Sequence, residues 1–394
     1  MTKRAPIDFT NTAIAFSGKT DAELKKATRL FALMNQSWLV NIGSKLGVAA
    51  LNLNLPFVEK TIKYTIFEQF CGGTTLLDSQ PVITRLYQQK VLSILDYGAE
   101  AKTTELDFNG TMNEAIRAVD FAEQNDSVPV ITIKISGLAR NELLEKIQKG
   151  EALSEEEKVE FTNVNKRVDA VCYAAHNKKV GVFFDAEESW IQDTIDFLAK
   201  KMMQRYNQER VIVYNTFQMY RHDRLQFLID SYEEARKEGY LLGAKLVRGA
   251  YMEKERERAA EMGYPSPIQP NKKATDNDYN TAVQFCVDNY AYIGSCNATH
   301  NAHSVALQAN LIDQKNIQKD HTHLNFCQLY GMSDHLTFNL ADAGYNVAKY
   351  LPYGPIKDVV PYLIRRAQEN SAVSGDMNRE YGLLVREMKR RGLK

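Results

Sequence analysis

Short runs of β-branched and apolar residues recur along the last three-quarters of the chain, each ending in polar or glycine residues. Segments with helical periodicity separate one run from the next. Eight runs of this kind begin at Ser93, Val130, Val180, Arg210, Leu242, Ile293, His323 and Val347. Strands that alternate with helices indicate parallel βαβ units, and eight of them indicate closure into a barrel of ~250 residues. The sequence therefore predicts an α/β fold, a TIM-like (β/α)8 barrel.

Two connections between the predicted strands are longer than the others. The charged segment 141–161 predicts an extra exposed helix, and 253–280 predicts a helix followed by a proline-rich loop. Residues 1–90 have a helical pattern, with 22–40 as the clearest amphipathic segment. We expect a helical N-terminal arm over 1–90 and one barrel domain over 91–394 that includes the C-terminal helix.

The composition is that of an ordinary globular protein. Lys and Arg total 49, equal to Asp and Glu, and 44% of the residues are hydrophobic, which excludes a disordered chain and argues against a protein that coats nucleic acid. The five cysteines form no C-x-x-C pair, as expected of reduced thiols in the cytosol. No signal peptide or membrane-spanning segment is expected.

Polar residues gather where the predicted strands end, which is where a (β/α)8 barrel places its reactive groups. They are Lys134, Asp185, Asn215, Lys245, Arg248, Tyr251, Thr299, His300, Asn301, Tyr350 and Tyr353. Taken singly, each could be a solvated loop residue, and Asp185 could cap the next helix. Lys134 and Asp185 follow neighbouring strands and could form an ion pair.

The last barrel helix carries a second polar group. Tyr362, Arg365, Arg366 and Glu369 fall on one face of this helix. One interpretation is a solvated stripe in which Glu369 pairs with an arginine. The other is a carboxylate site, because adjacent guanidinium groups bind carboxylates by paired hydrogen bonds.

Two other classes of site are not expected. The histidines of HNAH (300–303) and HTH (321–323) lack nearby carboxylate partners, so we predict no metal site. No G-x-G-x-x-G follows a predicted strand, so a dinucleotide would have to be held by barrel residues rather than by a Rossmann turn.

Seven segments, in this order along the chain, carry a resemblance to a known family: KISGLA, FFDAEES, KLVRGAYMEKER, ATHNAH, FCQLYGM, KYLPYGP and YLIRRAQEN. With them, residues from about 90 to 385 resemble the proline dehydrogenase family, in particular its monofunctional form. The resemblance implies a distorted (β/α)8 barrel that oxidises L-proline to 1-pyrroline-5-carboxylate with FAD and passes electrons to a membrane quinone. It also implies a separate pyrroline-5-carboxylate dehydrogenase as a possible partner.

The resemblance implies roles for individual residues. Lys134, Arg365 and Arg366 would contact the proline carboxylate, Asp185 would orient Lys134, and Lys134, Asp185 and Lys245 would form the catalytic group. The substrate ring would be walled by Tyr251, Leu329, Tyr350 and Tyr362. The flavin would be bound by Ala186, Asn215, Lys245, Val247, Arg248, Gly249, Ala250, Thr299, His300 and Glu369. Glu100 is the candidate for a gate ion pair with Arg365.

Three positions depart from the long bifunctional members of the family. Lys245 replaces an arginine, which changes how the flavin N5 would be hydrogen-bonded. Asn215 stands where a glutamine near the fourth strand end is expected, and Met252 replaces an aromatic residue.

The implied chemistry is removal of a hydride from C5 of proline, which needs no nucleophile. The main alternative is a Schiff-base lyase that uses Lys134, and a third possibility is a non-catalytic barrel scaffold. The C-terminal segment EYGLLVREMKRRGLK suits either a solvated helix or a helix at a membrane surface. We expect a cytoplasmic protein, and the second form of the helix would make it peripheral at the inner membrane face.

Overall fold

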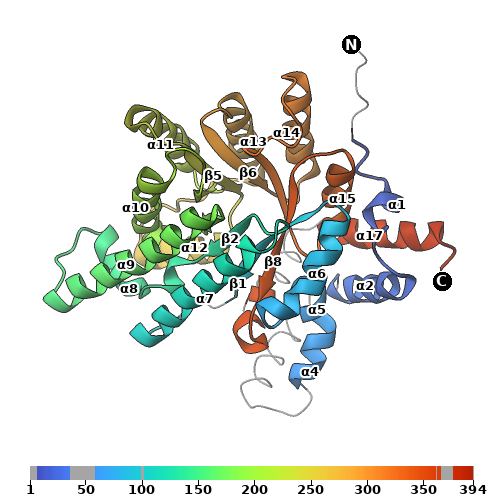
Figure 1. The fold of residues 1–394 in the computed structure, drawn as a ribbon, viewed down its shortest axis with the longest axis horizontal. Coiled ribbons are helices and arrows are strands. Elements are labelled where there is room, and N and C mark those ends of the chain that lie inside the picture. The colour runs from blue at the N-terminus through green and yellow to red at the C-terminus, as the bar shows by residue number, and fades with distance from the viewer. Residues whose placement is uncertain (1–6, 36–57, 99–101, 361, 365–375, 394) are drawn as a thin grey trace. The chain divides into compact units, whose positions relative to one another are not determined.

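The computed structural model describes residues 7–35, 58–98, 102–360, 362–364 and 376–393, and their course can be followed in Figure 1. By its internal contacts the chain divides into two compact units. Unit 1 comprises Met1–Gly98 and Cys327–Lys394, and unit 2 comprises Ala99–Phe326. The boundary predicted from the sequence, between 1–90 and 91–394, differs from this division and stays a prediction.

Eight parallel strands form a closed barrel in which each strand neighbours the next in sequence and β8 pairs with β1. The strands are β1 (Leu92–Tyr97), β2 (Val130–Ile133), β3 (Gly181–Phe184), β4 (Val213–Gln218), β5 (Leu242–Val247), β6 (Ile293–Ala298), β7 (Leu324–Leu329) and β8 (Val347–Tyr353). Every strand overlaps one of the eight runs recognised in the sequence. The predicted (β/α)8 fold is confirmed.

The strands of unit 2 are buried on both faces, as expected where helices cover the outside of a parallel sheet. These helices are α7 (Glu105–Glu123), α8 (Asn141–Gln148), α9 (Glu155–Lys178), α10 (Ser189–Tyr206), α11 (Arg224–Glu238), α12 (Met252–Met262), α13 (Lys272–Asp288) and α14 (Ala302–Gln314), with a 3-10 turn η2 (Ile135–Gly137) after β2. The first long connection holds α8 and the start of α9, and the second holds α12 and the proline-containing loop before α13. Both predictions are confirmed.

Unit 1 contains β1, β8 and a set of helices from both ends of the chain. They are α1 (Thr12–Ala15), α2 (Asp21–Met34), α4 (Val58–Ile62), the π-helical η1 (Lys63–Phe67), α5 (Glu68–Phe70), α6 (Leu76–Gln88), α15 (Asp334–Asp342) and α17 (Asp376–Arg390). Helix α2 begins with a capping box between Thr20 and Glu23, and its residues Leu24, Ala27 and Phe31 form a buried stripe. The arm is helical over its described residues, as predicted.

Helix α17 lies beside α1 and α2, so the two ends of the sequence meet in unit 1 (Figure 1). Leu384 of α17 is buried in the apolar core of the unit, and the partly buried Met388 packs against that core. The fully buried carboxylate of Glu387 accepts hydrogen bonds from Arg390 and Arg391. A membrane-surface helix is therefore the wrong interpretation for the face with Leu384 and Met388, because that face is packed inside the protein.

The five cysteines all lie within the described residues, are buried, and form no disulfide with one another. Within the described parts of the chain, no helix is both long enough and apolar enough to span a bilayer.

Candidate active site

Two buried lysines of unit 2 share one carboxylate at the strand ends. Asp185 directly follows β3, and its Oδ1 lies 2.5 Å from Nζ of Lys245, while its Oδ2 lies 3.5 Å from Nζ of Lys134. Lys134 follows β2, and Lys245 lies within β5. The side chains of these three residues are each at most 12% exposed. The ion pair expected between Lys134 and Asp185 is thus present.

Asp185 thus pairs with two ammonium groups at once. Ammonium groups at a barrel rim are suited to binding an anionic ligand, because water screens buried charges only weakly. Lys245 also lies over the ring of Phe183, 5.3 Å from its centroid, which further fixes the ammonium.

Glu187 adds a second buried carboxylate to this rim, and sequence reasoning did not single it out. One of its carboxylate oxygens accepts a hydrogen bond of 3.0 Å from the backbone N–H of Ser136, which ties the end of β3 to the end of β2. Burial raises the pKa of Glu187 to about 7, although the bonds from Ser136 and the charge of Lys134 act in the opposite direction. The feature of the sequence that could have identified Glu187 was its position two residues after Asp185.

The side chain of Asn215 is turned toward helix α10. Its Nδ2 donates to Oδ1 of Asp196 over 2.8 Å, and the other oxygen of Asp196 lies 2.5 Å from Nη1 of Arg224 on α11. Its neighbour Phe217 likewise packs on Phe227 of α11. The predicted flavin contact of the Asn215 side chain is not favoured by this geometry, because the amide holds β4 to its covering helices.

Gln218 is the last residue of the same strand. Its side chain and that of Thr216 lie on the face opposite to Asn215, because successive side chains of a strand alternate. Thr216 pairs in register with Lys245, and Gln218 pairs with Val247. The Gln218 side chain is buried, and among the described residues its Oε1 has no hydrogen-bond partner. The flavin role expected of Asn215 stays a prediction, and the structure offers Gln218 as a second buried amide of β4, on the opposite face of the strand.

Arg248, which follows β5, forms its side-chain hydrogen bonds with other residues of unit 2. Its guanidinium donates to Asp276 of α13 over 2.8 Å, to Oγ1 of Thr299 over 2.6 Å and to Ser304 over 3.0 Å. It also lies over the ring of Tyr279 at 4.2 Å. Arg248 thus fastens the ends of β5 and β6 to the outer helices, and a flavin would have to share it with Asp276.

Gly249 has a structural requirement of its own. Its φ of +133° lies outside the range of ordinary L residues, and an added Cβ would lie 2.4 Å from the ring of Tyr220. The absence of a side chain at Gly249 thus lets the ring of Tyr220 approach the backbone closely. Of the other residues predicted to bind flavin, Ala186 and His300 are half-buried after β3 and β6, and Val247 and Ala250 are half-buried around the end of β5.

The residues predicted to wall the substrate are divided between the units. Tyr251 precedes α12 in unit 2. In unit 1, Leu329 ends β7, Tyr350 is buried within β8, and Tyr362 belongs to the apolar core. Four other candidates, Glu100, Arg365, Arg366 and Glu369, lie outside the described residues.

Comparison with known proteins places this geometry in a family. The profile described as proline dehydrogenase matches residues 79–379. The chain is 33% identical over 322 residues to the carbapenem antibiotics biosynthesis protein CarD of Pectobacterium carotovorum subsp. carotovorum, covering 82% of this chain and 83% of CarD. It is 31% identical over 412 residues to the mitochondrial proline dehydrogenase 1 of Dictyostelium discoideum, covering 93% and 71% of the two chains.

A solved structure shows the same fold. It is proline utilization A (PutA) from Bdellovibrio bacteriovorus inactivated by N-propargylglycine, with a TM-score of 0.71 at 20% identity. The match covers 95% of this chain and 40% of the PutA chain, so this protein spans less than half the length of that relative. Since the family profile spans most of the chain and the barrel matches, the protein belongs to the proline dehydrogenase family.

Proposed function

We propose that this protein oxidises L-proline to 1-pyrroline-5-carboxylate, the first step of proline catabolism. The observation that carries the proposal is the pair of buried lysines, Lys134 and Lys245, that share Asp185 at the strand ends of a proline dehydrogenase barrel. This arrangement supplies a charged anchor for an amino-acid carboxylate and contains no serine or cysteine nucleophile.

FAD is the proposed cofactor, and when bound it would supply the acceptor for the hydride that leaves C5 of the substrate. The residues present fit such a group. Gln218 offers a buried amide whose oxygen has no partner among the described residues, and Lys245 offers a buried ammonium two strand positions from Val247. We assign Gln218 and Lys245 to the flavin, with Ala186, Thr299 and His300 as further contacts, and leave Asn215 with its structural role.

The chain's own contribution is to bind and orient the substrate. Lys134 would hold the carboxylate, and Asp185 keeps the Lys134 ammonium in one place. Positive charge close to the substrate also disfavours a protonated amine, because like charges repel, and the neutral amine is the form that can lose a hydride. Arg365 and Arg366 are proposed to assist in binding the carboxylate.

The geometry argues against the alternative of a Schiff-base lyase that uses Lys134. A lysine must be unprotonated to attack a carbonyl group, and an adjacent carboxylate stabilises the protonated form. Asp185 provides that carboxylate, 3.5 Å from the Lys134 ammonium. A scaffold without catalysis is also disfavoured, since burying three charged side chains at a rim has no structural need.

The test is a flavin spectrum with and without substrate. We expect the purified protein to be yellow, to lose flavin absorbance when L-proline is added without an acceptor, and to reduce an artificial acceptor. D-proline is the matched control for non-specific reduction. A colourless protein that cannot be reconstituted with FAD would refute the proposal, and borohydride trapping of substrate on Lys134 would support the lyase instead.

For the physiological acceptor we propose a quinone, reached by peripheral contact with a membrane, and for the product a separate pyrroline-5-carboxylate dehydrogenase. Helix α17 does not supply the membrane contact through Leu384 and Met388, which pack in and against the core. Flotation with liposomes that contain a quinone would show whether another surface does. We propose a reducing compartment such as the cytoplasm, supported by the absence of disulfides among the five cysteines, all of them described residues.

A further inference from the structure

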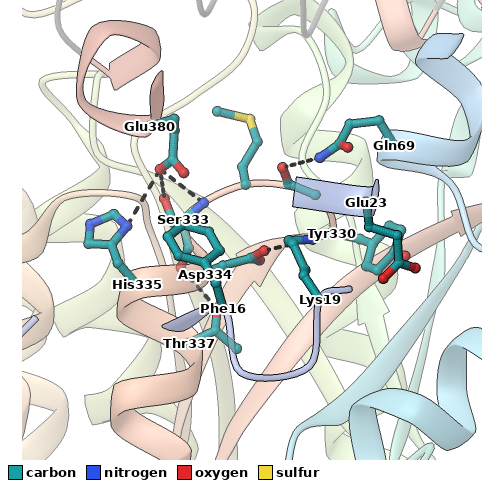
Figure 2. Close-up of polar contacts among 12 residues, drawn as sticks. Phe16, Lys19, Glu23, Gln69, Tyr330, Ser333, Asp334, His335, Thr337 and Glu380 are labelled. Carbon is teal, nitrogen blue, oxygen red and sulfur yellow. Dashed lines mark hydrogen bonds and ion pairs between the residues drawn. The ribbon is translucent and has the colours of Figure 1, made fainter. Parts of the chain in front are cut away.

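Charged and polar side chains from separate segments of unit 1 meet at the loop that joins β7 to α15, residues 330–333, called the β7–α15 loop below. Figure 2 shows Lys19 directed at Asp334, Glu380 directed at Ser333, and Gln69 directed at the loop backbone. The loop directly follows Leu329, one of the residues predicted to wall the substrate. The contacts that hold the β7–α15 loop therefore bear on the position of Leu329.

Lys349 makes the most direct of these contacts. It lies in β8 and its side chain is 1% exposed. Its ammonium lies 2.9 Å from Oδ1 of Asp334, donates to the backbone oxygen of Met332 over 2.5 Å, and lies 3.5 Å from the backbone oxygen of Leu329. An ammonium has three donors, so these three acceptors use all of them.

The same ammonium holds the two strand ends together. Tyr350 follows Lys349 and points to the opposite face of β8, because side chains alternate along a strand. The backbone N–H of Tyr330 donates to the oxygen of Tyr350 over 2.9 Å, which continues the pairing of β7 with β8 past Leu329. Leu329 and Tyr350, both predicted to wall the substrate ring, are thus linked through the backbone bond of Tyr330, the residue after Leu329, and through Lys349.

Asp334 completes this arrangement on the other side of the ammonium. Its second oxygen lies 3.3 Å from Nζ of Lys19, which comes from the segment before α2. Burial alone would raise the pKa of Asp334, but the charges of Lys349 and Lys19 outweigh it and lower the pKa to about 2. The carboxylate is therefore ionised throughout the range in which an enzyme works.

The rest of the loop is held as closely. Ser333 has a positive φ of 51°, an uncommon conformation for a residue other than glycine. Its backbone N–H and its hydroxyl both donate to Oε1 of Glu380, over 3.0 and 3.3 Å. Gln69 donates to the oxygen of Gly331 over 2.9 Å. The loop is thus fixed by side chains from β8, α5 and α17.

We propose that Lys349 is a positioning residue for the substrate pocket, which sets the spacing of Leu329 and Tyr350 and so the size of ring that the enzyme accepts. This inference rests on the proposed oxidation of proline. Lys349 does not contact the substrate, since it points away from the face of β8 that carries Tyr350. It acts through the backbone oxygens of Leu329 and Met332 and through Asp334.

Ring size is the property that such a residue would control. L-pipecolate has one more methylene in its ring than L-proline, and a well-formed apolar pocket discriminates one methylene by roughly 10- to 200-fold. Discrimination of this kind needs walls that cannot move apart. A role confined to stability would change the amount of folded enzyme and would leave the ratio between the two substrates unaltered.

The test compares kcat/KM for L-proline with kcat/KM for L-pipecolate in the flavin-loaded enzyme. We expect Lys349→Met to lower this ratio by about tenfold, within the range that one methylene commands, and to raise KM for proline more than it lowers kcat. Lys26→Met is the matched control, because the Lys26 side chain is 51% exposed in the same unit and pairs with Glu68 on the surface. Its ratio should equal that of the unchanged enzyme.

The double variant Lys349→Met/Asp334→Asn separates positioning from charge balance. It removes the carboxylate that the single variant leaves without its nearest partner, so it should fold at least as well as the single variant. The proposal predicts the same low ratio in both variants. An unaltered ratio in a folded variant would overturn it, and so would a double variant that does not fold, because Lys349 would then be required by the fold itself.

The outcome for the proposed function is read separately. If the unchanged enzyme does not oxidise L-proline, the proposed function fails, whatever the variants do. If it does and the ratio does not respond to Lys349, only the positioning role fails.

Discussion

Replacing Glu380 by Gln is expected to stabilise the protein in mildly alkaline solution and to change its stability little in acid. Glu380 is 3% exposed and lies among Ser333, Asp334 and His335, with Arg379 and Lys349 also close enough for their charges to be felt. Burial and the charge of Asp334 raise the pKa of Glu380 from 4.5 to about 7, against the opposing charges of Arg379 and Lys349. Its protonated form is therefore the one that the folded state favours.

The sign and size of the effect follow from this shift. A carboxyl group with a raised pKa in the folded state contributes full stability below about pH 4.5, and this contribution is lost as the pH rises through about 7. The rise in the pKa of Glu380 from 4.5 to about 7 corresponds to about 3 kcal/mol. Glutamine has the shape of the protonated acid, keeps an acceptor for Ser333 and cannot ionise, so Glu380→Gln avoids this loss.

His335 does not interfere with the measurement. Burial, together with the charges of Arg379 and Lys349, lowers the pKa of His335 to about 3, so the ring stays neutral across the range studied. Asp334 stays ionised over the same range, because its pKa is lowered to about 2. Neither His335 nor Asp334 therefore changes its charge between pH 5 and 8, the range in which Glu380 titrates.

The assay is urea unfolding followed by circular dichroism at pH 5, 6, 7 and 8, for the unchanged chain and for Glu380→Gln. We expect the variant to gain stability relative to the unchanged chain by about 3 kcal/mol between pH 5 and pH 8. Glu155→Gln, whose side chain is 84% exposed, is the control and should show no such trend. A difference between Glu380→Gln and the unchanged chain that is the same at every pH would refute the reasoning.

Three further experiments test unit 2. Lys134→Met should raise KM for L-proline strongly with a smaller fall in turnover in steady-state kinetics, because its charge acts in ground-state binding. Gln218→Leu should weaken FAD binding by about three- to tenfold, the value of one hydrogen bond, as measured by fluorescence titration of the apoprotein. Asn215→Leu should lower the stability of the fold instead. Equal effects of the two substitutions on FAD binding would contradict our assignment of Gln218 to the flavin. Arg224→Met should destabilise the fold by about 3–5 kcal/mol in denaturant unfolding, because it leaves Asp196 buried without its counter-charge, and adding Asp196→Asn should recover much of the loss.

The strands of the barrel could be recognised from the sequence because each strand carries its own signal. A buried parallel strand needs a short run of apolar, β-branched residues, and a covering helix needs an apolar stripe. Both patterns are local, as in β2 with VITI and β3 with GVFF. The pairing of Lys134 with Asp185 was also accessible, since consecutive strands of such a barrel are neighbours.

The choice between Asn215 and Gln218 was less accessible from sequence alone. Both are amides in the same buried strand, and only their position relative to the strand's alternation separates them. That alternation could be assigned once Asn215 was seen to bond Asp196 and Phe217 to pack on α11. Partners such as Asp196 come from helices whose rotation no strand pattern reveals.

The sequence by itself determined the order of strands and helices, the barrel that they close, the family, and the polar residues that follow the strands. The tertiary structure decided which contacts these residues make, as Arg248 does with Asp276 of a covering helix, and which of them share one carboxylate, as Lys134 and Lys245 share Asp185. It also decided that Asp334 is ionised while Glu380 favours its proton. The physical reason is that secondary structure follows from local periodicity, whereas the state of a buried charge depends on neighbours brought together from distant parts of the chain.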